Sequence, residues 1–192
     1  NDSQTRTFNC LTNLLSVRQN IEGTIEYAKL AADIGCPGVK VRPNGLQVDK
    51  GIPVEKTLEQ IGLSLRECGA AAADFGVQIR VEVHGRETKE PKYMRTMIDH
   101  ADHPNVYVCW NSNDGEAIDG SIKANFDLLK HKIGLVHITE LHKASYPWRE
   151  LFSELKGIGY EGFTLAEIPH SPEPERLLRY YKALWEAYGG NS

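Results

Sequence analysis

Short runs of β-branched and other apolar residues alternate with helix-like segments along almost the whole chain, and this alternation constrains the fold most strongly. Apolar residues recur at a helical period over residues 21–34, and Gly35 then acts as a stop signal. A short strand-like run follows at 38–42, and the alternation continues to the C-terminal region. Strands that alternate with helices pair in parallel, because a helical crossover returns the chain to the same edge of the sheet. The sequence therefore predicts an α/β fold with a parallel sheet.

The expected elements follow from periodicity and from turn residues. Pro53 and Pro91 each stand where a helix can begin, because the first helical turn leaves the missing N–H of proline unused. The expected strands lie at residues 5–10, 38–42, 77–83, 105–110, 133–138 and 162–168. The expected helices lie at residues 21–34, 53–76, 91–98, 122–129, 148–155 and 174–188. No linker or second domain interrupts this series, so we expect one domain over residues 1–192.

Composition and charge exclude several classes of protein. Apolar residues make up 41% of the chain and charged residues 25%, a balance that argues against a disordered protein. The net charge of −4 and the lack of a Lys/Arg cluster disfavour nucleic acid as a partner. No apolar run is long enough to cross a membrane. The four cysteines form no CxxC motif, which favours free thiols in a cytoplasmic protein over a structural zinc site.

Two architectures compete for a parallel sheet of this kind. A doubly wound sheet usually carries a Gly-rich phosphate turn after its first strand, and the sequence contains no GxGxxG or Walker motif. A (β/α) barrel places its chemistry at the carboxyl ends of many strands. Polar or ionisable residues stand at the end of every expected strand: Asn9 and Asn13; Lys40 and Arg42; Glu82 and His84; Asn111, Asn113 and Asp114; His137 and Glu140; Glu167 and His170. This pattern favours a TIM-type barrel.

Three of these polar residues lie inside otherwise apolar strands: Glu82, His137 and Glu167. Charge inside a parallel strand is costly unless it is paired or bound to a metal ion. Each residue alone has a simpler interpretation: His137 as a hydrogen-bonded core histidine, and Glu82 as half of an ion pair with Lys40 or Arg42. All three together, at matching depths of three strands, indicate a site for a hard cation with oxygen and nitrogen ligands.

Five segments in order, spanning nearly the whole chain, carry the motifs of one known family. They are residues 31–42, which end in Val39-Lys40-Val41-Arg42; Val81-Glu82-Val83-His84-Gly85; residues 108–114, which include Trp110-Asn111-Ser112-Asn113-Asp114; Val136-His137-Ile138-Thr139-Glu140; and residues 159–167, which end in Leu165-Ala166-Glu167. On these motifs the chain resembles the xylose isomerase-like TIM-barrel superfamily, the sugar phosphate isomerases and epimerases.

The resemblance implies a metal site and a pair of catalytic carboxylates. Glu82, Asn111, His137 and Glu167 match its four metal positions. Ligation rich in carboxylates favours Mn²⁺ or Mg²⁺, with Co²⁺ and Zn²⁺ as alternatives. In the epimerase branch Glu82 and Glu167 would also form an acid/base pair. One removes a proton next to a carbonyl group, and the other returns a proton to the opposite face.

Further residues are assigned to the substrate, and one metal position departs from the family pattern. Arg42 and His84 match positions that contact substrate oxygens, and we assign Asp114 and Glu140 to the substrate pocket as well. Asn111 stands where the family usually has Asp. A neutral amide oxygen is a weaker ligand than a carboxylate, so the metal would be held less tightly, or Asp114 would substitute as the ligand.

The number of strand–helix units is a second departure. The chain holds about six such units, whereas a complete barrel has eight. The segment that resembles the last strand lies near the C terminus, so we expect an incomplete barrel that lacks the first two units, its C-terminal three quarters. Either the chain is a fragment of a longer protein, or a partner segment or second copy completes the barrel.

The leading hypothesis is a divalent-metal-dependent isomerase or epimerase of a sugar or related polyol-ketone, although lyases and dehydratases use the same barrel. The alternative is a metal-free sugar-binding or regulatory relative without catalysis. An apurinic endonuclease shares the fold but needs a three-zinc cluster with several more His ligands than the three at strand ends, His84, His137 and His170. We expect a small-molecule sugar as the partner, with neither nucleic acid nor membrane.

Overall fold

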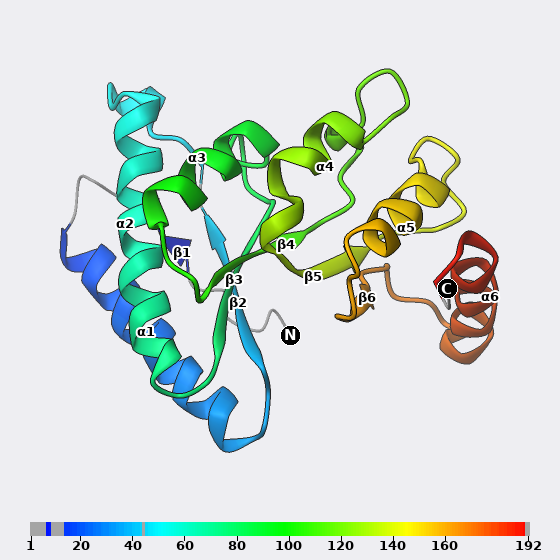
Figure 1. Cartoon of the computed structure of the whole chain (residues 1–192), viewed down its shortest axis with the longest axis horizontal. Helices are drawn as coiled ribbons and strands as arrows, with labels where there is room; N and C mark the ends of the chain where they lie inside the picture. The colour runs from blue at the N-terminus through cyan, green and yellow to red at the C-terminus, as the bar shows by residue number, and fades with distance from the viewer. Residues whose placement is uncertain (1–6, 9–13, 44, 191–192) are drawn as a thin grey trace.

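The computed structural model describes residues 7–8, 14–43 and 45–190. In this part of the chain six parallel strands form one sheet in the order β1-β2-β3-β4-β5-β6, as Figure 1 shows. The strands are β1 (Thr7–Phe8), β2 (Gly38–Pro43), β3 (Gln78–Glu82), β4 (Val106–Trp110), β5 (Ile133–Ile138) and β6 (Thr164–Ala166). Each strand pairs with the next one along the chain, which is the order of barrel strands and not that of a doubly wound sheet. The predicted TIM-type barrel fold is confirmed for these six units.

Helices connect the strands and cover one side of the sheet. They are α1 (Leu14–Asp33), α2 (Val54–Ala73), α3 (Pro91–Ala101), α4 (Lys123–Leu129), α5 (Trp148–Gly157) and α6 (Pro174–Tyr188). In the described ranges three short 3-10 turns lie in the connections: η1 (Val48–Lys50), η2 (Asp114–Glu116) and η3 (Lys130–Lys132). Each helix contacts the next one in sequence, so the helices form a continuous outer layer (Figure 1). Among the described residues no helix has the length and apolar character needed to span a membrane.

The predicted alternation of elements is confirmed, and the differences lie at element boundaries. Helix α1 begins at Leu14 instead of residue 21, because Val17 extends the buried stripe of Ile21 by one helical turn. Strand β6 covers only Thr164–Ala166 and is shorter than the predicted strand at 162–168. Among the described strands it pairs with β5 alone, so backbone hydrogen bonds hold it on one side only. The strand predicted at residues 5–10 is described only at Thr7–Phe8, where it forms β1, and its other residues lie outside the described part.

Strand β3 carries an apolar face and a polar face. In β3 the side chains of Ile79 and Val81 are fully buried in the core beneath the helices. Successive side chains of a strand point to opposite sides of the sheet, so Arg80 and Glu82 share the other face. Asn111, His137 and Glu167 lie on the same face, at or just beyond the ends of β4, β5 and β6. The alternation therefore places the ionisable residues on one inner surface while the outer surface packs against helices.

A buried acid fixes the loop that follows β4. Glu116 has no solvent exposure, and its carboxyl oxygens accept hydrogen bonds from the Tyr146 hydroxyl at 2.9 Å and from Asn113 Nδ2 at 3.0 Å. Trp110 Nε1 in turn donates to the Tyr146 hydroxyl oxygen at 2.9 Å. Burial raises the pKa of Glu116 to about 8, although these hydrogen bonds act in the opposite direction.

We predict that Glu116→Gln removes a pH-dependent loss of stability. The unfolded chain ionises Glu116 near its ordinary pKa of 4.5, whereas the folded protein holds the proton up to about pH 8. The folded state binds more protons in this interval, so the free energy of unfolding of the wild type falls as the pH rises from 4.5 to about 8. In thermal melts, the melting temperature of Glu116→Gln minus that of the wild type should increase across this pH range and become constant above it. A difference that is independent of pH would contradict the prediction.

Candidate metal centre

Four polar side chains from four neighbouring strands meet at the carboxyl ends of the sheet. Glu82 is the last residue of β3, Asn111 directly follows β4, His137 lies near the end of β5, and Glu167 directly follows β6. Glu82, Asn111 and His137 are buried, whereas the Glu167 side chain is 44% exposed. Glu167 is therefore the accessible residue of the four.

Strand register explains why residues so distant in sequence converge. Cys109 of β4 pairs with Leu135 of β5, so Asn111 and His137, each two residues further along, lie side by side on the same face. His137 pairs with Leu165 of β6, and Glu167 is again two residues further on this face. The positions climb by two residues from β3 to β4 and again from β5 to β6, in keeping with the stagger of barrel strands.

The facing atoms of these residues lie 3.0–3.6 Å apart, and a shared proton or cation would stabilise this arrangement of lone pairs. His137 Nδ1 lies 3.6 Å from Glu82 Oε1 and 3.4 Å from Glu167 Oε2. Asn111 Oδ1 lies 3.0 Å from His137 Nδ1, and this end of the amide lies 3.1 Å from each of the same two carboxylate oxygens.

This donor set fits a divalent cation. Adjacent ligands of an octahedral ion, each about 2.1 Å from it, are about 3 Å apart. Among the described residues, Glu82, His137 and Glu167 form the group of His, Cys, Asp and Glu side chains with metal-binding geometry, and the Asn111 oxygen adds a fourth atom to it. Two carboxylates, an imidazole and an amide are ligands that hard and borderline cations accept.

Glu82 uses its two carboxylate oxygens for different partners. Its Oε2 accepts Lys40 Nζ at 2.6 Å and Arg42 Nε at 3.0 Å, whereas its Oε1 faces the cluster. Burial alone would raise the pKa of Glu82, but hydrogen bonds from His137, Lys40 and Arg42 outweigh it and lower the pKa to about 2. The ion pairs that offered a simpler interpretation of Glu82 are thus present, and they coexist with the cluster.

His84 and Glu167 stand at the accessible side of the site. The Glu167 backbone N–H donates to the Ile138 carbonyl at 2.8 Å, which fixes the residue at the end of β6. His84 is half-buried, and burial lowers its pKa, although the charges of Glu82 and Glu167 act in the opposite direction. The neutral imidazole is therefore favoured at this position.

The structure does not bring every residue from the strand ends into the cluster. Asp114 lies in η2 with an exposed side chain, outside the Glu82–His137–Glu167 group. Glu140 lies in the loop after β5 and pairs with Lys143 at 3.4 Å. His170 is exposed and is likewise outside the group.

Ser112 supports the site, and the sequence analysis did not assign it a role. Its Oγ donates to the His137 carbonyl at 2.6 Å and accepts the Thr139 N–H at 3.2 Å, which ties the end of β4 to the end of β5. Ser112 has a φ of 46°, in the left-handed region that few residues other than glycine adopt. This turn lets Asn111 and Asn113 approach each other. The run of polar residues around Ser112 could have indicated a role in the site, but no sequence pattern predicted the sharp turn.

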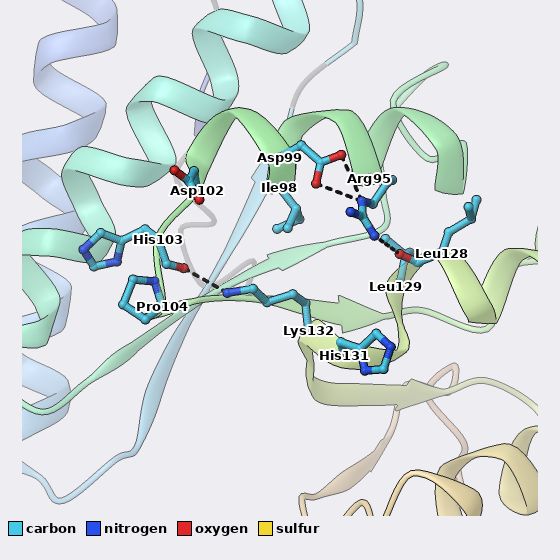
Figure 2. A pocket seen from close by; sticks show the side chains of 10 residues that line it. All are labelled: Arg95, Ile98, Asp99, Asp102, His103, Pro104, Leu128, Leu129, His131 and Lys132. Atoms are coloured by element: carbon cyan, nitrogen blue, oxygen red, sulfur yellow. Dashed lines mark hydrogen bonds and ion pairs between the residues drawn. The ribbon is translucent and has the colours of Figure 1, made fainter.

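A different pocket, of about 470 Å³, lies at the opposite ends of the strands, between α3 and η3 (Figure 2). Its cations already have partners within the protein. Arg95 pairs with Asp99 at 2.8 Å, and Lys132 Nζ donates to the His103 carbonyl at 2.9 Å. Among the described residues, the lining of this pocket contains no group of side chains placed to hold a metal ion, unlike the carboxyl ends of the strands.

Comparisons with solved structures agree with the barrel fold. The chain matches 3-keto-D-glucoside 4-epimerase from E. coli with a TM-score of 0.77 and 15% identity, over 95% of this chain and 76% of that one. It matches D-psicose 3-epimerase from Clostridium cellulolyticum H10 with a TM-score of 0.73 and 17% identity, over 92% and 72%. An AP endonuclease of family 2 from Brucella melitensis matches with a TM-score of 0.64 and 17% identity, over 86% and 67%. At these identities the likeness is one of fold.

No curated protein sequence matches the chain. A family model does match, over residues 4–184, and its description is xylose isomerase-like TIM barrel. This match includes every strand of the sheet and all four residues of the cluster. The chain therefore belongs to the xylose isomerase-like TIM barrel family.

Proposed function

We propose that this protein is a divalent-metal-dependent isomerase or epimerase that acts on a sugar or a related polyol-ketone. The observation that carries the proposal is the convergence of four lone-pair donor atoms at the carboxyl ends of the strands, where barrel enzymes place their chemistry. Solved structures of the same fold that are described as keto-sugar epimerases support the substrate class.

Glu82, Asn111, His137 and Glu167 would hold the cation. The two carboxylates and the amide oxygen favour Mn²⁺ or Mg²⁺. Such a cation, when bound, polarises the carbonyl and hydroxyl oxygens of a substrate. Arg42 and His84, which lie beside the cluster, are proposed to contact substrate oxygens, and Asp114 and Glu140 are proposed to act from the loops after β4 and β5.

The two glutamates are proposed as the acid/base pair, although their surroundings differ. Glu167 is the carboxylate that a substrate carbon can reach, because its side chain is 44% exposed. It would remove the proton from a carbon next to the carbonyl group, and the electron pair would move to the carbonyl oxygen. Return of a proton to the neighbouring carbon gives an isomer, and return to the opposite face gives an epimer. Glu82 is the proposed partner on that second face.

We predict that Mn²⁺ raises the melting temperature of the wild type and that His137→Ala abolishes this effect. A ligand that binds only the folded state stabilises it by about 2.7 kcal/mol at 100 times its Kd. Replacing His137 removes one of the four donors, whereas the control His142→Ala removes an exposed histidine outside the cluster. Thermal melts and the metal content of the purified protein give the answer. A wild type that carries no metal and is unaffected by Mn²⁺ would instead support a sugar-binding relative without catalysis.

We predict that Glu167→Gln loses exchange between a substrate's carbon-bound proton and solvent by about 10²- to 10⁴-fold. Gln keeps the size and an oxygen ligand but cannot take a proton. Glu82→Gln should lose exchange as well, because the proposed pair needs a group that carries a proton on each face of the carbon. The measurement is NMR of panels of keto sugars in D₂O with saturating Mn²⁺, with Glu175→Gln as control. Full rescue of Glu167→Gln by excess Mn²⁺ would mean that Glu167 only binds the metal.

A further inference from the structure

The amide of Asn111 can face the cluster in two ways, and only one of them supplies a metal ligand. With nitrogen inward, Nδ2 would donate to Glu82 Oε1, Glu167 Oε2 and His137 Nδ1 at 3.0–3.1 Å. With oxygen inward, which is the orientation in the structure, Oδ1 faces those same three atoms. An amide nitrogen donates hydrogen bonds and does not ligate a hard cation. The role of Asn111 therefore depends on what fixes the direction of its amide.

The neighbouring Asn113 has a direction that its own contacts determine. Its Nδ2 donates to the Val83 carbonyl at 2.7 Å and to Glu116 Oε1 at 3.0 Å. A backbone carbonyl can only accept, so the end of Asn113 that faces Val83 must be the nitrogen, whatever the protonation state of Glu116. The oxygen of Asn113 must consequently lie at the other end.

That oxygen faces Asn111. Asn111 Nδ2 donates to Asn113 Oδ1 at 3.3 Å, and reversing the Asn111 amide would place two acceptor oxygens against each other. The hydrogen bond with Asn113 thus favours the orientation in which Asn111 Oδ1 points to Glu82, His137 and Glu167. It acts against the three hydrogen bonds that the reversed amide would donate to those residues. The Val83 carbonyl thus fixes the amide of Asn113, and Asn113 in turn orients the amide of Asn111.

We propose that Asn113 is a positioning residue that turns the amide oxygen of Asn111 toward the metal centre. This inference rests on the proposed metal site. Val83, which anchors Asn113, directly follows Glu82, and its N–H donates to the Cys109 carbonyl at 3.0 Å. Val83 therefore belongs to the same strand pair as Glu82 and Asn111. The group that orients the amide is held in place by the strands that carry these two proposed ligands.

The test compares Mn²⁺ affinity of Asn113→Ala and Asn125→Ala by EPR and calorimetry on the intact chain. Asn125 is a matched control, because its Nδ2 donates to the Glu116 carbonyl at 2.9 Å and tethers the same loop without touching Asn111. Loss of an outer partner of a metal ligand typically weakens metal binding by about 10- to 100-fold. We expect this loss for Asn113→Ala and unchanged affinity for Asn125→Ala. Melts without metal report any loss of stability separately.

A second pair of variants separates orientation from general disruption. Asp presents an oxygen at both ends, so Asn111→Asp no longer needs an orienting partner. We expect Asn113→Ala to weaken Mn²⁺ binding in the Asn111 background and to have no such effect in the Asn111→Asp background. Asn111→Asp in turn should restore the affinity that Asn113→Ala loses.

The outcomes are distinguishable. Equal affinities for Asn113→Ala and Asn125→Ala, or the same loss in both backgrounds at position 111, would overturn the role of Asn113 while leaving the metal site in place. Absence of Mn²⁺ binding by the wild type would overturn the metal site and this inference together. Loss specific to Asn113→Ala with rescue by Asn111→Asp supports both.

Discussion

The ionised Glu82 carboxylate, which has no solvent exposure, is the feature on which the site depends. A buried charge is tolerated only when it is paired, and removing one partner of such a pair typically costs about 3–5 kcal/mol. Lys40 and Arg42 supply the partners from the neighbouring strand β2. Because both bind the same oxygen, the other oxygen remains directed at His137 and Asn111. The ion pairs therefore hold Glu82 in place and leave it able to ligate.

The order of the elements and the polar ends of the strands could be predicted from the sequence, because periodicity reports burial and the ends of parallel strands share one edge. Other features depend on local geometry that no pattern encodes. Asp114 follows Asn111 closely in sequence, yet the left-handed turn at Ser112 and the η2 turn leave it exposed. The partner that anchors Asn113 is the backbone of Val83, and sequence patterns do not mark backbone partners.

The charge balance explains why the direction of one amide matters. The carboxylates of Glu82 and Glu167 bring two negative charges to the cluster, and Lys40 and Arg42 bring two positive charges to its border. An amide oxygen contributes only a dipole. Because these charges cancel, the site attracts a cation chiefly through short-range ligation, and each lone pair must point toward the ion.

Glu167 differs from the other three donors in the strand that carries it. Glu82, Asn111 and His137 stand on strands flanked on both sides, whereas β6 pairs with β5 alone among the described strands and comprises only Thr164–Ala166. Short edge strands open at a lower free energy than a protein's core. A cation bound by both Glu167 and His137 would therefore link β6 to β5 and stabilise their pairing. Binding of the ion and pairing of β6 with β5 would then stabilise each other, because a ligand that binds only the paired state favours that state.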